Sequence, residues 1–325
     1  MKRRHLLRLG TAASLAAIFP SARAQGWPER PLRLVVGFPP GQSSDLAARN
    51  YAAAMAKALG QAIVVDNKPG ANGSLGAQEV KAARADGYTL LFGTSGQLSI
   101  NPALYRRLPF DPLVDFDPVG LLVSGPLFLV AHPAFPAHGV QELLALAKAK
   151  PGAIDYGSGG NGVTGHFAME MLQAMAGVRL NHIPYNGSPA ALNDLMAGRI
   201  SLMMESGQAC LPHAKAGRLK VLACSSAHRA AAYPTVPPVA EQGLPDFDVV
   251  AWNGMMVPVG TPAAIRERLH AAIRQASADP LVVDSLRAAG AEPGTSESPA
   301  QFHRFLQAEI AKWKKVVAQN GITPT

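Results

Sequence analysis

The chain has 325 residues, a length typical of two domains, with 48% hydrophobic and 16% charged residues. This balance supplies a substantial core and excludes a largely disordered protein. Thirty basic against 22 acidic residues give a net charge of +8, which raises the question of a nucleic-acid partner.

The first residues predict export. A basic start (MKRRHLLR) precedes an apolar stretch over residues 9–19, and Ala22-Arg23-Ala24 follows as a small-residue cleavage site. The apolar stretch is too short to cross a bilayer, so we expect residues 1–24 to be a cleaved signal peptide. Arg3-Arg4 also fits a twin-arginine signal, and the sequence leaves that route and the Sec route to the periplasm open.

Removal of the signal peptide changes the charge argument. It takes away five basic residues and no acidic ones, which leaves 25 basic against 22 acidic residues and a net charge of +3. The excess that suggested a nucleic-acid partner therefore belongs mostly to the targeting segment. We predict no nucleic-acid partner, because no basic stripe remains.

Strand-like and helix-like segments alternate from residue 32 onward. In order, they are a strand over 32–37, a helix with apolar residues at helical spacing over 47–59, a strand over 63–65, a helix ending near 85 and a strand over 89–93. Ser43 or Ser44 is expected to cap the first helix, with Asp45 in its first turn. This order predicts a parallel, doubly wound α/β sheet.

The same alternation restarts in the middle of the chain. It predicts strands over 153–157, 180–185, 201–204 and 219–224, with helices over 164–175 and 189–196. Apolar segments over 119–132 and 249–257 separate this run from its neighbours. Only helices are expected afterwards. The last begins at Ser298-Pro299, with serine as N-cap and proline at the first helical position, and Gly321 ends it.

The helical tail lacks a sheet of its own, so we expect it to pack back on the N-terminal lobe. The chain then crosses between lobes twice, near Gly125 and near Val250. Residues 25–125 plus 251–325 are predicted to form lobe 1, and residues 126–250 lobe 2. In such a hinged molecule the ligand site lies in the cleft, beside the carboxyl ends of the strands.

Three strand-to-loop turns are polar and rich in glycine: FPPGQSSD (38–45), GTSGQ (93–97) and GSGGNGVT (157–164). Glycine lets backbone N–H groups approach a ligand, and a helix N-terminus offers free donors and partial positive charge. One such turn is ordinary chemistry for a strand-to-helix connection. Three at equivalent strand ends predict a site that binds an anion without lysine or arginine.

Enzyme interpretations fit the sequence less well. Gly157-x-Gly159-x-x-Gly162 matches the dinucleotide fingerprint, but the next strand ends without an acidic residue for a ribose. Ser95 and Ser158 both lack the G-x-S-x-G context of a hydrolase nucleophile. His166, His182 and His213 lack metal-ligand spacing. We therefore predict no catalytic residue, no metal and no cofactor.

The chain has two cysteines, Cys210 and Cys224, without CxxC or zinc spacing. We expect two buried thiols that act as small hydrophobic side chains. A disulfide stays open as the alternative, because an exported protein meets an oxidising compartment.

Long segments resemble one family throughout residues 27–321. Among them are WPERPLRLVVGFPPG (27–41), VVDNKPGANGSLGA (64–77), YGSGGNGVTGH (156–166), HIPYNGSPAALNDLMAGRI (182–200) and YPTVPPVAEQGLPDF (233–247). The chain resembles the substrate-binding proteins of tripartite tricarboxylate transporters, the Bug or TctC family. The resemblance implies a two-lobed periplasmic binding protein of the type II clamshell kind, without catalytic activity. Its implied partners are a small organic carboxylate or amino acid and membrane transporter subunits, and we expect a monomer.

From the turns and the resemblance together, we predict the following ligand-binding residues: Phe38, Pro39, Gly41, Gln42, Ser43, Asp45, Thr94, Ser95, Gln97, Ser158, Gly159, Asn161, Val163, Thr164, Tyr185, Asn186 and Glu205. Three positions depart from the family's usual residues. The family usually has glycine where this chain has Gln42, aspartate where it has Ser201, and Asp-Asn where it has Glu205-Ser206. Two alternatives stay open: a ligand sensor for a membrane kinase, and an exported hydrolase that uses Ser158 or Glu205.

Overall fold

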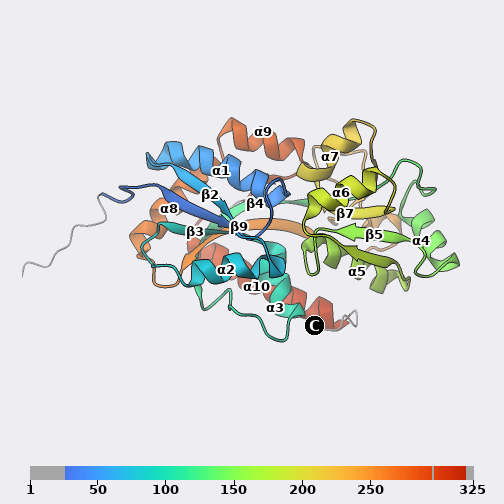
Figure 1. The fold of residues 1–325 in the computed structure, drawn as a ribbon, viewed down its shortest axis with the longest axis horizontal. Coiled ribbons are helices and arrows are strands. Elements are labelled where there is room, and N and C mark those ends of the chain that lie inside the picture. The colour runs from blue at the N-terminus through green and yellow to red at the C-terminus, as the bar shows by residue number, and fades with distance from the viewer. Residues whose placement is uncertain (1–25, 295, 320–325) are drawn as a thin grey trace, which may run out of the picture.

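The computed structural model describes residues 26–294 and 296–319. The predicted signal peptide and Gly321 lie outside the described residues. Two groups of helices and strands stand side by side, and two long strands run through the middle and join them (Figure 1). The prediction of a two-lobed α/β fold is confirmed.

The N-terminal group contains β1 (Leu32–Val36), α1 (Ser43–Leu59), β2 (Ile63–Asn67), α2 (Ser74–Lys81), β3 (Thr89–Thr94) and α3 (Asn101–Leu104). Short turns of 3-10 and π helix, Ala71–Gly73 and Gly96–Ile100, precede α2 and α3. Strand β1 lies between β2 and β3 and is parallel to both. Its leucines and valines are buried, as expected for a central parallel strand.

The middle group contains α4 (Val140–Ala149), β5 (Asp155–Ser158), α5 (Thr164–Ala176), β6 (Asn181–Pro184), α6 (Ser188–Met196), β7 (Leu202–Ser206), α7 (Gly207–Lys215) and β8 (Lys220–Cys224). A 3-10 turn, Ala240–Gln242, follows β8. Strand β5 lies between β6 and β7 and is parallel to both. Helices α5, α6 and α7 each begin directly after a strand or a short loop, so their N-termini gather at one edge of this sheet.

Strands β4 (Phe116–Ala131) and β9 (Val250–Pro258) connect the two groups. They run antiparallel from the Phe116–Pro258 pair to the Pro126–Val250 pair. The remainder of β4, from Leu127 onward, pairs instead with β7 and β8. The two strands therefore lie next to each other where β4 leaves β9, at the Pro126–Val250 pair. The residue limits of the lobes themselves stay a prediction.

Two local predictions at the first helices are wrong. Neither Ser43 nor Ser44 caps α1. The extended backbone ends at Gln42, which is the N-cap, and Ser43 is already the first residue of the helix. The left-handed Gly41, at φ +79°, completes the turn that sets this early start. Helix α2 ends at Lys81 instead of near residue 85, because the chain tightens into a turn in which the Ala83 N–H donates to the Val80 carbonyl.

The tail contains α8 (Ala263–Ala276), α9 (Pro280–Ala288), the short strand β10 (Glu292–Pro293) and α10 (Pro299–Gln319). Strand β10 pairs with β4, so the expectation of helices alone is wrong. Helix α9 lies against α1, where Lys57 Nζ contacts Asp279 Oδ2 at 2.9 Å. Ser298 caps the start of α10 as predicted, since its hydroxyl accepts the Gln301 N–H at 3.2 Å.

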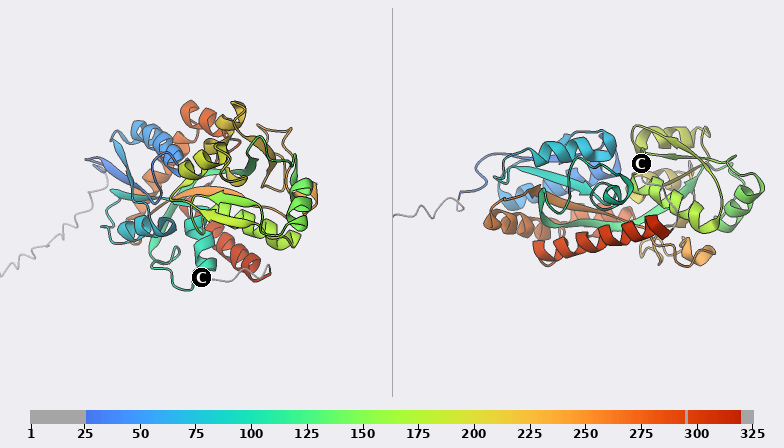
Figure 2. Two further views of the ribbon diagram at one scale, coloured as in Figure 1. Left: turned by 45° about the vertical axis from the view of Figure 1, so that its right-hand side comes forward. Right: turned by 90° about the horizontal axis from the view of Figure 1, so that it is seen from below.

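Helix α10 corrects the expectation that the whole tail packs on the N-terminal lobe. Its first half packs Phe302 and Leu306 into the core around β9. Its second half buries Trp313 and Val317 in the core of the middle group. The ring of Trp313 meets that of Phe167 from α5 edge to face, with centroids 5.2 Å apart. Figure 2 shows α10 running along one side of the molecule beneath both groups.

Cys210 and Cys224 are both buried and free in the structure, as the buried-thiol prediction expected. Within residues 26–294 and 296–319, no helix combines the length and apolarity that crossing a bilayer requires.

The contact between α10 and α5 gives a first prediction. Replacing Trp313 by alanine leaves a cavity against Phe167, and we expect a loss of about 3–5 kcal/mol in the free energy of unfolding. Urea denaturation measures it. The exposed neighbour Lys314 is the control, because Lys314→Ala should change stability by less than about 0.5 kcal/mol. Equal effects of the two substitutions would show that the tail contributes little to the middle group.

Candidate functional site

A hollow lies where the two groups of elements meet, and we call it the inner cavity. Its volume is about 90 Å³. Both crossing strands contribute to its wall through Pro126, Ala251 and Trp252. An outer groove of about 540 Å³ adjoins it and shares Phe38 and Val163 with it. Ligand sites of binding proteins are commonly such concave spaces between two lobes.

Four helices begin at the inner cavity. The first residues of α1, α5, α6 and α7 all line it, namely Ser43, Thr164, Ser188 and Gly207. None of these helices has a side-chain hydrogen bond at its N-cap. Helix α9 differs, because the Asp279 side chain accepts the Leu281 N–H there. Uncapped helix starts present free N–H groups and partial positive charge, so the cavity is suited to an anion.

Several polar side-chain atoms around the inner cavity lack a partner. Within the described chain, the buried Ser44 Oγ, Ser206 Oγ, Gln208 Nε2 and Gln42 Oε1 make no hydrogen bond. A buried polar group left unpaired costs about 1–3 kcal/mol. Three of these atoms are donors, and a bound anion would satisfy them.

The charge of the cavity wall comes from one residue. Within the described ranges, Glu205 is the only acidic side chain that lines the inner cavity, and no lysine, arginine or histidine does. Glu205 is 8% exposed. Its carboxyl accepts hydrogen bonds from the Ser188 hydroxyl and, at 2.8 Å, from the Ser206 N–H. Burial raises the pKa of Glu205, and these donors act in the opposite direction.

Hydrogen bonds join the two groups beside the inner cavity. Ser95, after β3, lies with its hydroxyl 3.0 Å from that of Thr164 at the start of α5. The Trp252 N–H of β9 donates to the same Ser95 hydroxyl at 3.3 Å. Close packing reinforces this contact, because a Cβ on Gly96 would lie 3.2 Å from the Thr164 nitrogen. The turn after β3 is therefore in contact with the opposite side of the cleft.

The structure brings thirteen of the seventeen predicted ligand-binding residues to the two hollows. Those at the inner cavity are Phe38, Gln42, Ser43, Thr94, Ser95, Val163, Thr164 and Glu205. Those found only at the outer groove are Pro39, Gly159, Asn161, Tyr185 and Asn186. Their role in binding stays a prediction.

Gly41, Asp45, Gln97 and Ser158 line neither hollow. Asp45 instead holds the first turn together, because its carboxylate accepts the Gly41 N–H at 2.9 Å and two hydrogen bonds from Arg49. Burial opposes the ionisation of Asp45, but these donors and Asn67 outweigh it and lower its pKa. The Gln97 amide donates to the Gly73 carbonyl at 2.6 Å.

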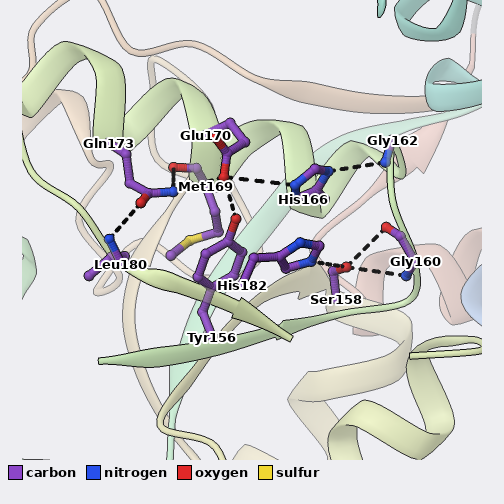
Figure 3. Close-up of polar contacts among 10 residues, drawn as sticks. All are labelled: Tyr156, Ser158, Gly160, Gly162, His166, Met169, Glu170, Gln173, Leu180 and His182. Atoms are coloured by element: carbon purple, nitrogen blue, oxygen red, sulfur yellow. Dashed lines mark hydrogen bonds and ion pairs between the residues drawn. The ribbon is translucent and has the colours of Figure 1, made fainter. Parts of the chain in front are cut away.

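Ser158 faces a pair of half-buried histidines beside the glycine-rich turn (Figure 3). Its hydroxyl lies 2.7 Å from His182 Nε2 and donates to the Gly160 carbonyl at 3.0 Å. The rings of His182 and His166 are stacked, with centroids 4.0 Å apart. His166 Nδ1 accepts the Gly162 N–H at 3.0 Å. Both histidines therefore contact the turn directly, His182 at Ser158 and His166 at Gly162.

The chain matches the family model described as tripartite tricarboxylate transporter family receptor over residues 47–322. The chain belongs to this receptor family. It is 35% identical to protein BugT of Bordetella pertussis over 98% of each chain. Among solved structures, it is similar to Rhodopseudomonas palustris Rpa4515 with adipate (TM-score 0.88, 35% identity, covering 92% of this chain and 100% of that one). The periplasmic binding protein BugD gives a TM-score of 0.87 at 32% identity, covering 91% and 99%.

The receptor's structure also shows cavity residues that the sequence prediction missed. Ser44, Ser206, Gly207 and Gln208 line the inner cavity. The last three form the junction at which β7 ends, at Ser206, and α7 begins, at Gly207. Its polar and glycine-containing sequence, ESGQ, was the available signal. Gly207 is required there by close packing, because a Cβ would lie 1.9 Å from the Ala289 carbonyl oxygen. Within the described residues, no three His, Cys, Asp or Glu side chains gather as a metal site.

The histidine pair gives a prediction for stability against pH. Burial lowers the pKa of His166 to about 4, and burial with the neighbouring His166 lowers that of His182 to about 4. As the pH falls, the unfolded chain, in which the histidine pKa is near 6.5, therefore binds protons before the folded chain does. Stability should be complete above about pH 6.5 and fall by about 2–4 kcal/mol toward pH 4. Denaturant titrations at several pH values measure this loss.

His182→Asn should reduce that pH dependence, because one of the two histidines no longer titrates. Carboxylates such as Glu170, 3.7 Å from His166, remain in both proteins, so the informative quantity is the difference between variant and parent. The exposed His138→Asn should keep the parent's slope. An unchanged slope in His182→Asn would contradict the assignment.

Proposed function

We propose that the protein captures a small organic carboxylate in the cleft and presents it to the membrane subunits of a tripartite tricarboxylate-type transporter. The observation that carries this proposal is the meeting of four uncapped helix N-termini at one small cavity. Free backbone donors hold a carboxylate without a basic side chain. The related Rpa4515 was solved with adipate, which supports the same class of ligand.

Capture is followed by hinge motion about the paired crossings of β4 and β9. In the described part of the chain, strands β4 and β9 and helix α10 connect the groups, and hinge closure around a ligand is common in two-lobed arrangements. The hydrogen bond between Ser95 and Thr164 supports a role for closure, since it joins the two sides of the cleft. Closure then sequesters the carboxylate, and the closed form docks on the transporter as a monomer.

A binding role is favoured over the hydrolase alternative by the placement of Ser158. Its hydroxyl is engaged by His182 and Gly160, and it lines neither hollow, so a substrate in the cleft does not reach it. A ligand sensor would use the same cleft, and a membrane kinase instead of a transporter as its partner. Co-purification with the membrane subunits distinguishes these two roles.

Ligand binding is tested first by thermal shift. A panel of mono-, di- and tricarboxylates and amino acids should contain compounds that raise the melting temperature, because a ligand that binds only the folded state stabilises it. Native mass spectrometry of the non-denatured protein identifies any ligand retained from the cell. A complete panel without any shift, and protein without a bound mass, would refute carboxylate capture.

A substitution tests whether the ligand occupies the inner cavity. Ser44→Ala removes an unpaired donor at the start of α1, and we expect the best ligand of the panel to bind about 5- to 100-fold more weakly. Calorimetry measures the affinity. The exposed Thr235, which lines neither hollow, provides Thr235→Ala as the matched control with unchanged affinity. The same loss in both variants would place the ligand elsewhere.

Export is tested at the N-terminus. We propose cleavage after Ala24, so protein from the periplasmic fraction should begin at Gln25 when sequenced. Replacing Arg3 and Arg4 together by lysines separates the two routes. Twin-arginine export should stop, whereas Sec export should continue, because Sec signals need only positive charge. A precursor that stays uncleaved in its parent form would contradict the proposal.

A further inference from the structure

Gly162, in the glycine-rich turn before α5, lies where the two groups of elements touch. It is buried, and its φ is +78°. A Cβ at this position would lie 2.7 Å from Asn72 Nδ2 and 3.1 Å from the Tyr105 hydroxyl, both in the N-terminal group. Its carbonyl oxygen lies 3.3 Å from the place where Gly96 would carry a Cβ. Gly162 therefore packs against the N-terminal group through both its α-carbon and its carbonyl.

The backbone of this residue is held by one side chain of its own group. The Gly162 N–H donates to His166 Nδ1 at 3.0 Å (Figure 3). The residues on either side of Gly162 line the hollows, Asn161 at the outer groove and Val163 at both. The imidazole of His166 thus fixes the position of this segment relative to α5.

This hydrogen bond needs a neutral imidazole. Because Nδ1 is the acceptor, the proton of the neutral His166 ring lies on Nε2, and a second proton would occupy Nδ1. The protonated ring would then turn an N–H toward the Gly162 N–H, and the bond would be lost. A buried N–H without an acceptor is unfavourable, whereas water can replace the imidazole once the turn withdraws from the N-terminal group.

His182 contacts the same turn but responds differently to a proton. Ser158 has a single hydroxyl proton, which it donates to the Gly160 carbonyl, so His182 Nε2 is the donor to the Ser158 oxygen. A proton added at the other ring nitrogen of His182 leaves that donation in place. His166 is therefore the member of the pair whose protonation removes a hydrogen bond of the turn.

Three titratable side chains face His166: Glu170 on its own helix at 3.7 Å from Nε2, Tyr156 on β5 and His182 on β6. From the other elements packed on α5, the contacts are Met204 of β7 and Trp313 of α10, neither of which titrates here. Within the described residues, no lysine or arginine forms an ion pair with this cluster. Burial lowers the pKa of His166 to about 4, although Glu170 is near.

We propose that His166 is a positioning residue for ligand capture: its neutral imidazole holds the glycine-rich turn in the geometry that closes on a ligand, and protonation of the ring weakens binding. The inference rests on the proposed capture of a carboxylate and adds its regulation by acidity. His166 lines neither hollow, so it acts through Gly162. Because the ring is more easily protonated once the turn withdraws, affinity should be complete above about pH 6.5 and fall toward pH 4.

Nitrogen-15 NMR of protein labelled at histidine tests the hydrogen bond itself. At pH 8, His166 should show an unprotonated Nδ1 and a protonated Nε2, and its signals are assigned by their loss in His166→Asn. A proton on Nδ1 at this pH would overturn the proposal.

Calorimetry at pH 7.5 and pH 5.0 tests the coupling to binding, with malate, succinate, adipate, benzoate and glutamate as probes. His166→Asn places an amide oxygen near the position of Nδ1 but does not titrate. For the tightest-binding probe, the parent should lose about 3- to 30-fold more affinity at pH 5.0 than this variant does. Protonation of the probe is common to both proteins and cancels. The exposed His138→Asn should keep the parent's loss.

A leucine substitution tests positioning at neutral pH. His166→Leu removes the acceptor, so binding at pH 7.5 should weaken by about 5- to 100-fold, and His166→Asn should recover at least about threefold of this loss. His182→Gln, which keeps a donor for Ser158, should retain the parent's fall in affinity at pH 5.0. Where His166→Leu folds poorly, the pH comparison of the asparagine variant decides.

The outcomes distinguish failure of this inference from failure of the proposed function. If a probe binds the parent but loses the same affinity at pH 5.0 in His166→Asn, the role of His166 is disproved and carboxylate capture stands. If none of the five probes binds the parent at pH 7.5, capture of such carboxylates is refuted, and its regulation by His166 falls with it.

Discussion

Helix starts without a side-chain cap, with the backbone N–H donors that such starts offer, are the constraint on which the site depends, and α1, α5, α6 and α7 provide them. Such donors need strands that end at one edge, short glycine-containing turns, and N-cap positions free of side-chain acceptors. The parallel sheets provide the first condition. Gly41, Gly187 and the residues around them provide the others. The cleft can thus attract an anion although basic side chains are absent from the described cavity wall.

Much of this arrangement could be predicted from the sequence. Polar glycine turns after apolar runs indicate strand ends and helix starts, and three residues of these turns, Ser43, Val163 and Thr164, line the inner cavity. The directions of side chains could not be predicted in the same way. Gln97 and Ser158 belong to the same turns, yet Gly73 and His182 on other elements hold them away from the hollows. These partners are distant in sequence, so only the folded chain shows them.

The apolar stripe of α10 illustrates a second limit. Its spacing correctly predicts a long helix with one buried face. Spacing says which side chains are buried but not against which partner, so the contact of Trp313 with Phe167 was not predicted. The turn between β7 and α7 was missed for a different reason. Its Glu205-Ser206 departs from the family's usual residues, and residue spacing alone does not show that a helix begins directly after Ser206.

Helix α10 also links the wall of the inner cavity to the core of the middle group. The Glu309 carboxylate accepts hydrogen bonds from Trp252, in the cavity wall, at 2.9 Å and from Trp313 at 3.2 Å. Apparent affinity is the intrinsic affinity scaled by the fraction of molecules already in the competent conformation. If that conformation is the one described, contacts of α10 with both groups increase this fraction before any ligand arrives. Sequence changes in α10 could then adjust how much ligand is retained while every group that touches the ligand stays the same.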